Sequence, residues 1–386
     1  MTKTKIIITS DKYPPDYSGS ALRICRFAER MKNENYEFSI ITQDNGKNYG
    51  KENSVTRIKI KTPKILFPLF FTEMLLKANS SLKKAEGDIL HCVSFTWINM
   101  AMLTINGAFY KRKSILEITL QGDDDPESFT AKNIVTKLMK PLTKYAFSKT
   151  DLIIVLNKQS LKSCTNFGIP ESKLWFRPNP VDSAAFRPPK KGEKDQLRKK
   201  LALPKGFIIA NIAIFQKRKN QLDLIYAFEA LPESDKAKTF LLFMGPPDPD
   251  EPEYYESVKK YIAQKKLENS IILPGFVKNT NEYLRASDLF AFASKGEGFA
   301  NVLIEAIMSG LPIITSPVEG TDIIVNPRNG RIAEPPTPEN FSKLLAMAIN
   351  KKLKLDPKKI RKDAERAYST GKIDAQYAAH YKRLLK

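Results

Sequence analysis

The chain has 386 residues, of which 42% are hydrophobic and 27% are charged; this predicts two globular domains and excludes wholesale disorder. The net charge of +21 is spread over both halves and favours anionic partners: nucleic acid, an anionic membrane surface or phosphate-bearing ligands. No apolar run approaches the roughly 20 residues that span a bilayer, and the three cysteines, which are far apart, favour neither a disulfide framework nor a zinc site.

Short β-branched runs alternate with helical patterns through the first half of the chain. The run Lys5–Thr9 has the composition of a buried parallel strand, and residues 21–31 place apolar side chains at helical spacing. A longer helical stretch is expected over Lys132–Ser148. The other strands predicted here are Phe38–Thr42, Asp88–Val93, Ser114–Leu120 and Leu152–Leu156. This alternation predicts a doubly wound parallel sheet.

The alternation stops at a segment rich in proline and lysine, Phe186–Gly206, and then restarts. The new strands are expected at Phe207–Ile212, Thr239–Gly245, Ser270–Gly275, Leu289–Phe292 and Pro312–Ser316. The predicted fold class is therefore α/β, with two doubly wound parallel-sheet (Rossmann-like) domains facing a cleft. We expect the domains at residues 1–183 and 184–373, with a C-terminal helix at 374–386 that packs back on the first domain.

The densest chemical signal is the segment Ser294–Pro312, which holds two carboxylates eight residues apart. Glu297 stands between glycines, so it is expected on a tight loop after a strand, and Glu305 about one turn inside the next helix. Open α/β sheets bind ligands at the carboxyl ends of their strands. The unpaired N–H groups of a helix N-terminus near Phe299 suit a diphosphate, and a carboxylate accepts hydrogen bonds from vicinal sugar hydroxyls. The alternative interpretation of this segment is an ordinary amphipathic helix with solvated acids, but such a helix does not require the Gly-Glu-Gly loop.

This segment resembles the Glu-x(7)-Glu motif of the retaining glycosyltransferases of family four (glycosyl transferases group one), which have the GT-B fold. Other segments match the same family in the same order: Pro14–Gly19, Arg177–Pro188, Lys219–Asn220, Gly245, Gly275–Val277, Ser287–Phe290 and Asn329–Gly330. The resemblance covers nearly the whole chain. Its specific part is the second half, and the first half is diffuse.

The resemblance implies roles for individual residues. Glu297 would contact the hydroxyls of the donor sugar, and Glu305 would bind the ribose of the nucleotide. Lys219 with Arg218 would neutralise the diphosphate leaving group, and Gly19 would let the backbone approach the donor phosphates. The remaining donor-binding residues would be Gly298, Phe299, Ala300, Asn301 and Val302. The family implies no metal and no cofactor, since the nucleotide-diphosphate sugar is itself a substrate.

Two departures from the family pattern concern the donor site. The family usually has an arginine where this chain has Ile214, and Lys217 and Arg218, which stand next to Lys219, are both candidates to replace it. The family also often places a histidine after the strand Ser114–Leu120, where this chain has none. Either Gln121 or Asp123 supplies that sugar contact instead, or the chain lacks it.

The two histidines and one aspartate run leave further possibilities. His91 follows a predicted strand, where the family often has a histidine facing the acceptor; a catalytic role and a buried, hydrogen-bonded role both stay open. His380, on the terminal helix, is expected to be structural. Asp123–Asp125 matches an Asp-x-Asp metal motif of another glycosyltransferase fold, but lacks that fold's context, so no metal is expected.

Lysines and apolar residues occur together in two parts of the first half. Lys59–Lys77 could lie in a membrane interface beside anionic lipid heads, or could pack on the first domain as a loop and helix. Lysines also recur through the helical stretch expected over Lys132–Ser148, where they could form a basic ridge or an ordinary solvated face. These lysines are Lys132, Lys137, Lys140, Lys144 and Lys149.

The sequence and the resemblance together predict a retaining, metal-independent hexosyltransferase. It would move a sugar from a nucleotide sugar to a hydroxyl of a glycan or a lipid-diphosphate-linked acceptor, in cell-surface polysaccharide or lipopolysaccharide biosynthesis. We expect a cytoplasmic protein at the inner face of the membrane, because no signal peptide is evident. The alternatives are a non-catalytic, degenerate partner and a nucleotide-sugar epimerase on the same fold. Specific nucleic-acid binding is not expected, because the basic residues are dispersed and no known nucleic-acid-binding motif is recognised.

Overall fold

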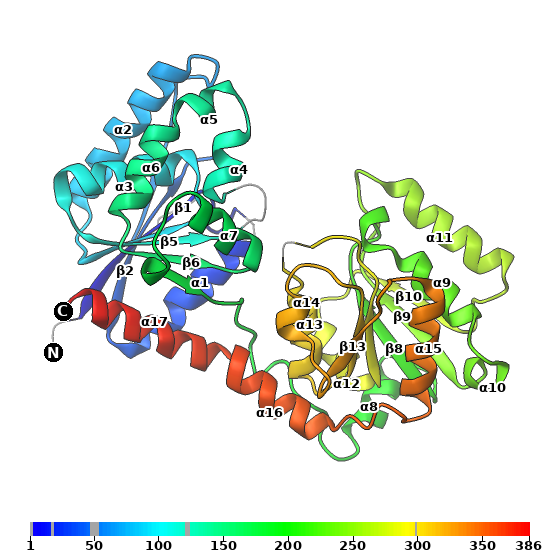
Figure 1. Ribbon diagram of the computed structural model, residues 1–386. Helices are drawn as coiled ribbons and strands as arrows, with labels where there is room; N and C mark the ends of the chain where they lie inside the picture. The colour runs from blue at the N-terminus through cyan, green and yellow to red at the C-terminus, as the bar shows by residue number, and fades with distance from the viewer. Residues whose placement is uncertain (1–2, 17–18, 47–53, 120–123, 298) are drawn as a thin grey trace. The chain divides into compact units, whose positions relative to one another are not determined.

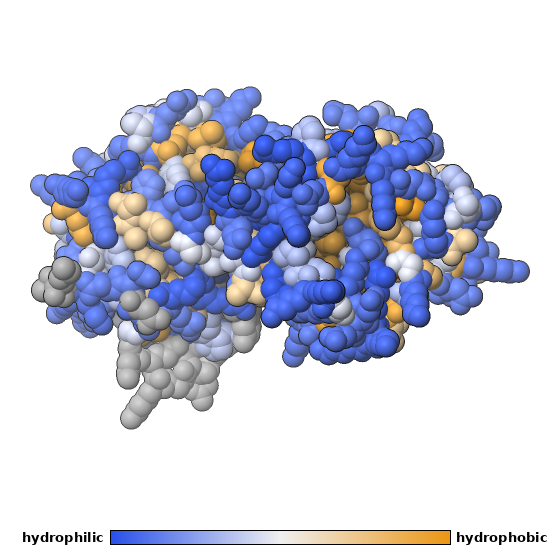
Figure 2. Space-filling view, turned by 90° about the horizontal axis from the view of Figure 1, so that it is seen from below, coloured by the Kyte–Doolittle hydropathy of each residue, from blue (hydrophilic) through white to orange (hydrophobic). Residues whose placement is uncertain are grey.

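A computed structural model of the chain describes residues 3–16, 19–46, 54–119, 124–297 and 299–386 (Figure 1). The chain divides into two compact units, the first made of residues 1–178 and 374–386 and the second of residues 179–373. The boundary thus lies after Pro178, five residues before the one expected from sequence, and the C-terminal segment belongs to the first unit. Hydrophilic side chains cover most of the face in Figure 2.

The first unit is built on a seven-stranded parallel sheet in the order β3-β2-β1-β4-β5-β6-β7. Its strands are β1 (Thr4–Ser10), β2 (Tyr36–Gln43), β3 (Val55–Ile58), β4 (Ile89–Val93), β5 (Lys113–Ile118), β6 (Leu152–Val155) and β7 (Leu174–Phe176). Ile6, Ile7 and Ile8 of β1 are fully buried at the centre of this sheet, which explains why their run is uninterrupted by polar residues. The edge strands β3 and β7 were not expected from the sequence.

The helices of the first unit cover both faces of its sheet. They are α1 (Gly19–Met31), α2 (Phe67–Lys84), α3 (Trp97–Ile105), α4 (Pro126–Ala131), α5 (Ile134–Leu138), α6 (Lys140–Lys149), α7 (Lys158–Asn166) and α17 (Thr370–Leu384), with short turns at Lys32–Glu34, Asn106–Tyr110 and Glu171–Lys173. The single helix expected over Lys132–Ser148 is wrong, because α5 ends at Leu138 and α6 begins again at Lys140. Pro141, which has no backbone N–H to donate, lies in the first turn of α6.

The terminal helix α17 packs on the first unit through aromatic side chains. The ring centroids of Phe27 and Tyr377 are 4.7 Å apart, and those of Tyr36 and Tyr381 are 5.5 Å apart. Near the start of α17, Asp374 pairs with Arg30 of α1 at 2.6 Å. These contacts place α1 and α17 against each other, as Figure 1 shows.

The second unit has a six-stranded parallel sheet in the order β10-β9-β8-β11-β12-β13. Its strands are β8 (Phe207–Ile212), β9 (Thr239–Met244), β10 (Ile271–Gly275), β11 (Leu289–Phe292), β12 (Ile313–Thr315) and β13 (Gly330–Ile332). Its helices are α8 (Glu193–Lys200), α9 (Gln221–Glu229), α10 (Glu233–Lys236), α11 (Pro252–Gln264), α12 (Thr280–Ala286), α13 (Asn301–Met308), α14 (Thr321–Ile324), α15 (Pro338–Ile349) and α16 (Pro357–Tyr368), with a short turn at Lys217–Lys219. One apolar cluster covers each face of this sheet. The carboxyl ends of the adjacent strands β8, β11 and β12 therefore carry neighbouring loops.

Candidate functional site

The candidate site lies on the second unit, in the loops that follow β8 and β11. Lys219 ends the short turn after β8, and Glu297 lies five residues beyond the end of β11. These strands are hydrogen-bonded neighbours, so residues 78 positions apart in sequence meet at one edge of the sheet.

Glu297 is the centre of a small charged cluster. Lys219 Nζ lies 2.6 Å and Arg218 Nη1 lies 3.3 Å from Glu297 Oε1. Ser294 Oγ donates to the same oxygen at 2.6 Å. The side chain of Glu297 is 9% exposed and that of Lys219 is 14% exposed, whereas that of Arg218 is 45% exposed. Burial, which outweighs the attraction of Glu297, lowers the pKa of Lys219.

Glu305 has a contrasting environment one helix away. It lies in α13, partly exposed, and no described residue donates a hydrogen bond to its carboxylate. Burial of the carboxylate raises its pKa from the ordinary 4.5 to about 7. An acid with this desolvation cost and no protein partner is a candidate for contact with ligand hydroxyls.

The N-terminus of α13 lies between these two acids in sequence. Ala300 is the residue before the helix, and no side chain caps the first turn. Unpaired N–H groups and the helix dipole make such an end favourable for an anion. Asn301 is exposed at the first position, where its amide oxygen accepts a hydrogen bond from Asn179 at 3.2 Å. Val302 follows it, partly exposed.

Phe299 is held by the loop that follows β12. A Cβ atom added to Gly320 would lie 2.9 Å from the ring of Phe299, so only glycine leaves room for this contact. Gly320 also has a φ of +86°, a conformation that other residues adopt at a cost. The loops after β8, β11 and β12, three neighbouring strands of the sheet, therefore form one site.

Some residues expected at the donor site belong to the first unit, to a backbone contact after β8, or to segments outside the described part. Gly19 is the first residue of α1, in the first unit. Ile214 lies in the loop after β8, where its backbone oxygen accepts a hydrogen bond from the side chain of Gln221. Gly298, Gln121 and Asp123 lie outside the described residues.

His91 is completely buried in β4, and both its ring nitrogens have partners. Nδ1 is 2.8 Å from the hydroxyl of Tyr381, and Nε2 is 3.2 Å from Oε1 of Glu117. Of the two possibilities that the sequence left open, this environment favours the buried, hydrogen-bonded histidine. His380 stacks on Trp175, with ring centroids 4.1 Å apart.

Glu117 joins His91 to the rest of a buried polar cluster. Arg23, Tyr377 and His91 all contact its carboxylate, and Arg177 Nη2 lies 3.7 Å away. Burial alone would raise the pKa of Glu117, but Arg23, His91 and Arg177 outweigh it and hold the pKa well below its usual range. Sequence reasoning missed this cluster, although a glutamate within the apolar run of a central strand is the signal that could have revealed it. It also missed Ser294.

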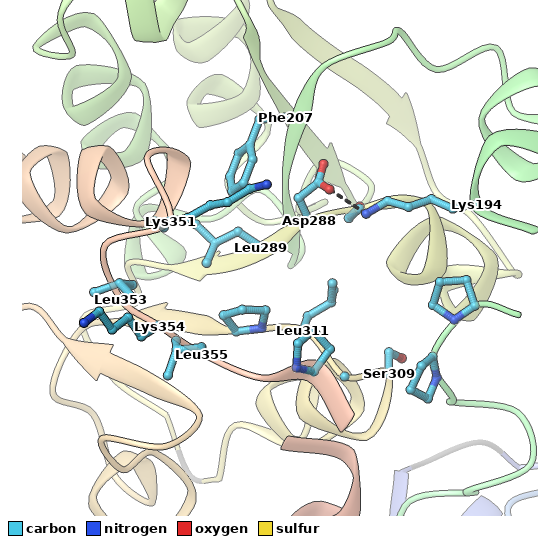
Figure 3. Close-up of a pocket in the computed structure, with 17 residues that line it drawn as sticks. Lys194, Phe207, Asp288, Leu289, Ser309, Leu311, Lys351, Leu353, Lys354 and Leu355 are labelled. Atoms are coloured by element: carbon cyan, nitrogen blue, oxygen red, sulfur yellow. Dashed lines mark hydrogen bonds and ion pairs between the residues drawn. The ribbon is translucent and has the colours of Figure 1, made fainter. Parts of the chain in front are cut away.

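A separate hollow of about 400 Å³ lies at the opposite edge of the second sheet (Figure 3). Phe207 and Leu289, which begin β8 and β11, line it with leucines of the segment after α15. Lys194 and Asp288 form an ion pair there at 2.5 Å. Because the hollow lies where strands begin, it is distinct from the Glu297 site.

Neither a metal site nor a membrane span is found in the part of the chain that the structure describes. No three histidine, cysteine, aspartate or glutamate side chains among the described residues are grouped to hold a metal ion. No helix within the described ranges is both long and apolar enough to cross a membrane. The three cysteines are free.

Comparison with known proteins shows the same family along both halves of the chain. Residues 17–185 match the model of Glycosyltransferase Family 4, and residues 193–367 match that of Glycosyl transferases group 1. An uncharacterized glycosyltransferase of Methanocaldococcus jannaschii, MJ1069, is 22% identical over 362 residues, which cover 89% of this chain and 88% of that protein.

Other relatives are matched over shorter stretches. The N-acetylgalactosamine-N,N'-diacetylbacillosaminyl-diphospho-undecaprenol 4-alpha-N-acetylgalactosaminyltransferase of Campylobacter jejuni is 29% identical over 191 residues, 49% of this chain. The chain spans about half the length (48%) of that protein, and the same share of a second glycosyltransferase of Methanocaldococcus jannaschii, MJ1059.

Solved structures show the fold over the whole chain. HepE of Anabaena in complex with UDP matches with a TM-score of 0.75 at 17% identity, over 99% of this chain and 100% of that one. Sucrose-phosphate synthase of Thermosynechococcus elongatus matches with a TM-score of 0.73 at 19% identity, over 99% of each chain. The two Rossmann-like units therefore form the GT-B α/β fold. With both halves matched by the family models, the chain belongs to the glycosyltransferases of group 1 and family 4.

Proposed function

We propose that the chain is a retaining, metal-independent glycosyltransferase that uses a nucleotide-diphosphate sugar as donor. Its acceptor would be a hydroxyl of a glycan or of a lipid-diphosphate-linked sugar, in cell-surface polysaccharide or lipopolysaccharide assembly at the inner face of the membrane. The observation that carries the donor part is the pairing of two cations with Glu297 beside the uncapped end of α13, one helix turn from the unpartnered carboxylate of Glu305. A neighbour in fold, HepE of Anabaena, was solved with UDP and glucose, so UDP is the first nucleotide to test.

The ion pairs indicate how a donor would enter. Lys219 and Arg218 both form ion pairs with Glu297. Diphosphate oxygens would replace Glu297 as the partner of these cations, and the released carboxylate could then accept hydrogen bonds from sugar hydroxyls. Glu305 would accept hydrogen bonds from the two ribose hydroxyls.

The chemical step then follows from charge. When the bond between the anomeric carbon and the diphosphate breaks, its electron pair goes to the phosphate oxygen, and Lys219, Arg218 and the N–H groups of α13 stabilise that charge. The acceptor hydroxyl attacks the same face of the sugar, and its proton passes to the leaving phosphate. No protein nucleophile is required, and the anomeric configuration is kept.

The test has a binding stage and a transfer stage. Melting of the purified chain is measured with UDP and other nucleoside diphosphates, and a ligand at about 100 times its Kd should stabilise the fold by roughly 2.7 kcal/mol. Transfer from the matching nucleotide sugar to glycan and lipid-linked acceptors is then followed, with the anomeric configuration read by NMR. No stabilisation by any nucleotide would refute the donor site. Binding without transfer to any acceptor would favour a non-catalytic partner, an alternative to which the absence of the usual arginine at Ile214 is relevant.

A further inference from the structure

A polar hollow of about 460 Å³ lies on the first unit, between α4, α6 and the end of α7. Three lysines from two consecutive helices line it: Lys137 of α5, and Lys140 and Lys144 of α6. The ammonium nitrogens of Lys140 and Lys144 each lie 5.9 Å from the ring centroid of Phe167. Because both cations approach the same ring, the positive charges converge on one hollow instead of being spread along a ridge.

The charge of this hollow is not neutralised by the protein. None of the three lysines forms an ion pair with a residue that the structure describes. Glu127 is the one carboxylate among the lining residues, and its Oε2 is 3.4 Å from Nδ2 of Asn166. Lys140 is also the first residue of a ten-residue helix without a capping side chain, so the helix dipole adds to the positive potential. Clustered ammonium groups of this kind recognise phosphate.

Exposed apolar side chains adjoin the hollow. Ile134 and Leu138 are 70% and 72% exposed, and they lie at the two ends of α5, the helix that carries Lys137. At the start of α2, Ile65 is 91% and Leu69 is 62% exposed. Isolated exposed leucines are common, but several beside unpaired lysines form the pattern that binds an anionic lipid interface.

An aromatic cluster links the start of α2 to α4, the helix that precedes α5. The ring of Trp97 lies 4.9 Å from that of Phe67 in α2 and 5.1 Å from that of Phe129 in α4. Lys132, which follows α4, lies over the ring of Phe129 at 5.8 Å. Because α4 also contacts α5, helices α2, α4 and α5 lie near one another in the first unit (Figure 1).

We propose that the three-lysine hollow binds the phosphate of a phosphorylated lipid, and that Ile134 and Leu138 enter the apolar part of the lipid interface beside it. The recognised group is a phosphate or diphosphate, which a soluble compound could also supply, so the experiment has one arm for each source. Use of the site by a lipid-diphosphate-linked acceptor rests on the proposed function, whereas lipid binding can be measured without any transfer.

The first experiment measures binding of the full chain to vesicles of phosphatidylcholine with and without phosphatidylglycerol. The variant Lys137→Ser/Lys140→Ser/Lys144→Ser is compared with a control that removes three exposed lysines of α16. The control is Lys358→Ser/Lys359→Ser/Lys362→Ser, which changes the net charge equally. At roughly fivefold per lysine near an anionic surface, the first variant should bind about 100-fold more weakly, and the control should change little. Equal loss in both variants would refute a local site, because the overall positive field would then explain binding.

The second experiment separates lipid from soluble phosphate. Calorimetry with inorganic pyrophosphate should show a component of the heat of binding that is lost in the Lys137/Lys140/Lys144 variant and kept in the α16 control. Ile134→Ser/Leu138→Ser should weaken vesicle binding and leave that component intact. Pyrophosphate binding without vesicle binding would overturn the lipid assignment, and absence of both would overturn the site.

A readout on the second unit keeps the two proposals distinguishable. Stabilisation by nucleoside diphosphates is measured on the same lysine variants, which lie outside the Glu297 site. Vesicle binding without any nucleotide effect would refute the proposed function and leave this inference standing, and the reverse result would refute only this inference.

Discussion

Replacing Glu305 by glutamine should stabilise the chain and weaken its nucleotide binding at the same time. Burial raises the pKa of this carboxyl from 4.5 to about 7 in the folded protein, so the folded state binds its proton more tightly than the unfolded state does. Folding stability therefore falls as pH rises from about 4.5 to 7, and the whole penalty is present above pH 7. The full difference corresponds to at most about 3 kcal/mol, and solvent screening of this partly exposed group lowers that limit.

The variant Glu305→Gln is neutral at every pH and so avoids this penalty. At pH 8 it should be more stable than the parent chain by about 1–3 kcal/mol, and near pH 5 the two should differ little. Loss of a charged acceptor for the ribose hydroxyls should weaken nucleotide binding by about 10- to 100-fold. In the parent chain, nucleotide binding should also weaken as pH falls below 7, because the carboxyl then becomes protonated.

Thermal melting between pH 5 and pH 8.5, with and without UDP, checks both effects. The exposed Glu268 supplies a control, because Glu268→Gln makes the same chemical change on the surface of the same unit. Equal stability of the Glu305 variant and the parent at pH 8, together with an unchanged nucleotide shift, would refute the reasoning. Lost stability at every pH would show that the carboxyl has a protein partner.

Three further variants test other parts of the structure. Lys219→Ala should lower kcat by about 100- to 1000-fold. Arg218→Ala should lower it by less, because the side chain of Arg218 is 45% exposed. Equal losses of kcat in steady-state kinetics would contradict this order. Glu117→Gln leaves the buried Arg177 and the partly buried Arg23 without their counter-ion, and it should lower the free energy of unfolding in urea at pH 7 by about 3–5 kcal/mol. Because the pKa of Glu117 is low in the folded chain, this contribution to stability is lost as pH falls, so the difference between the variant and the parent should shrink in acid. Gly320→Ala should lower the free energy of unfolding by about 1–2 kcal/mol, because φ is +86° and the new methyl group meets Phe299. It should also reduce the stabilisation by nucleotide in the melting assay. An unchanged stabilisation by nucleotide would mean that Phe299 does not shape the site.

Local sequence patterns were enough to predict the two-part α/β architecture and the acidic residues at the centre of the candidate site. Uninterrupted β-branched runs such as Ile6–Ile8 are typical of buried strands in a parallel sheet, and these local patterns predicted most strands within one or two residues. Glu297 and Glu305 could be placed from their own neighbours, because a glycine loop and a helix start are local features.

Other features depended on which strands become neighbours, which no local pattern specifies. The edge strands β3 and β7 are only partly buried and so lack the uninterrupted apolar run of the central strands. The break between α5 and α6 was hidden by continuous helical spacing. Only the tertiary structure shows that Lys219 contacts Glu297, 78 positions away in sequence. It also shows that His91, which the sequence left open as a candidate catalyst, contacts Glu117. It also shows that Lys137, Lys140 and Lys144 line one hollow, where the sequence alone left a basic ridge and a solvated face open. For Glu297 and Glu117 the deciding energy comes from largely buried polar contacts between residues that are distant in sequence, so it depends on the folded arrangement and not on sequence spacing.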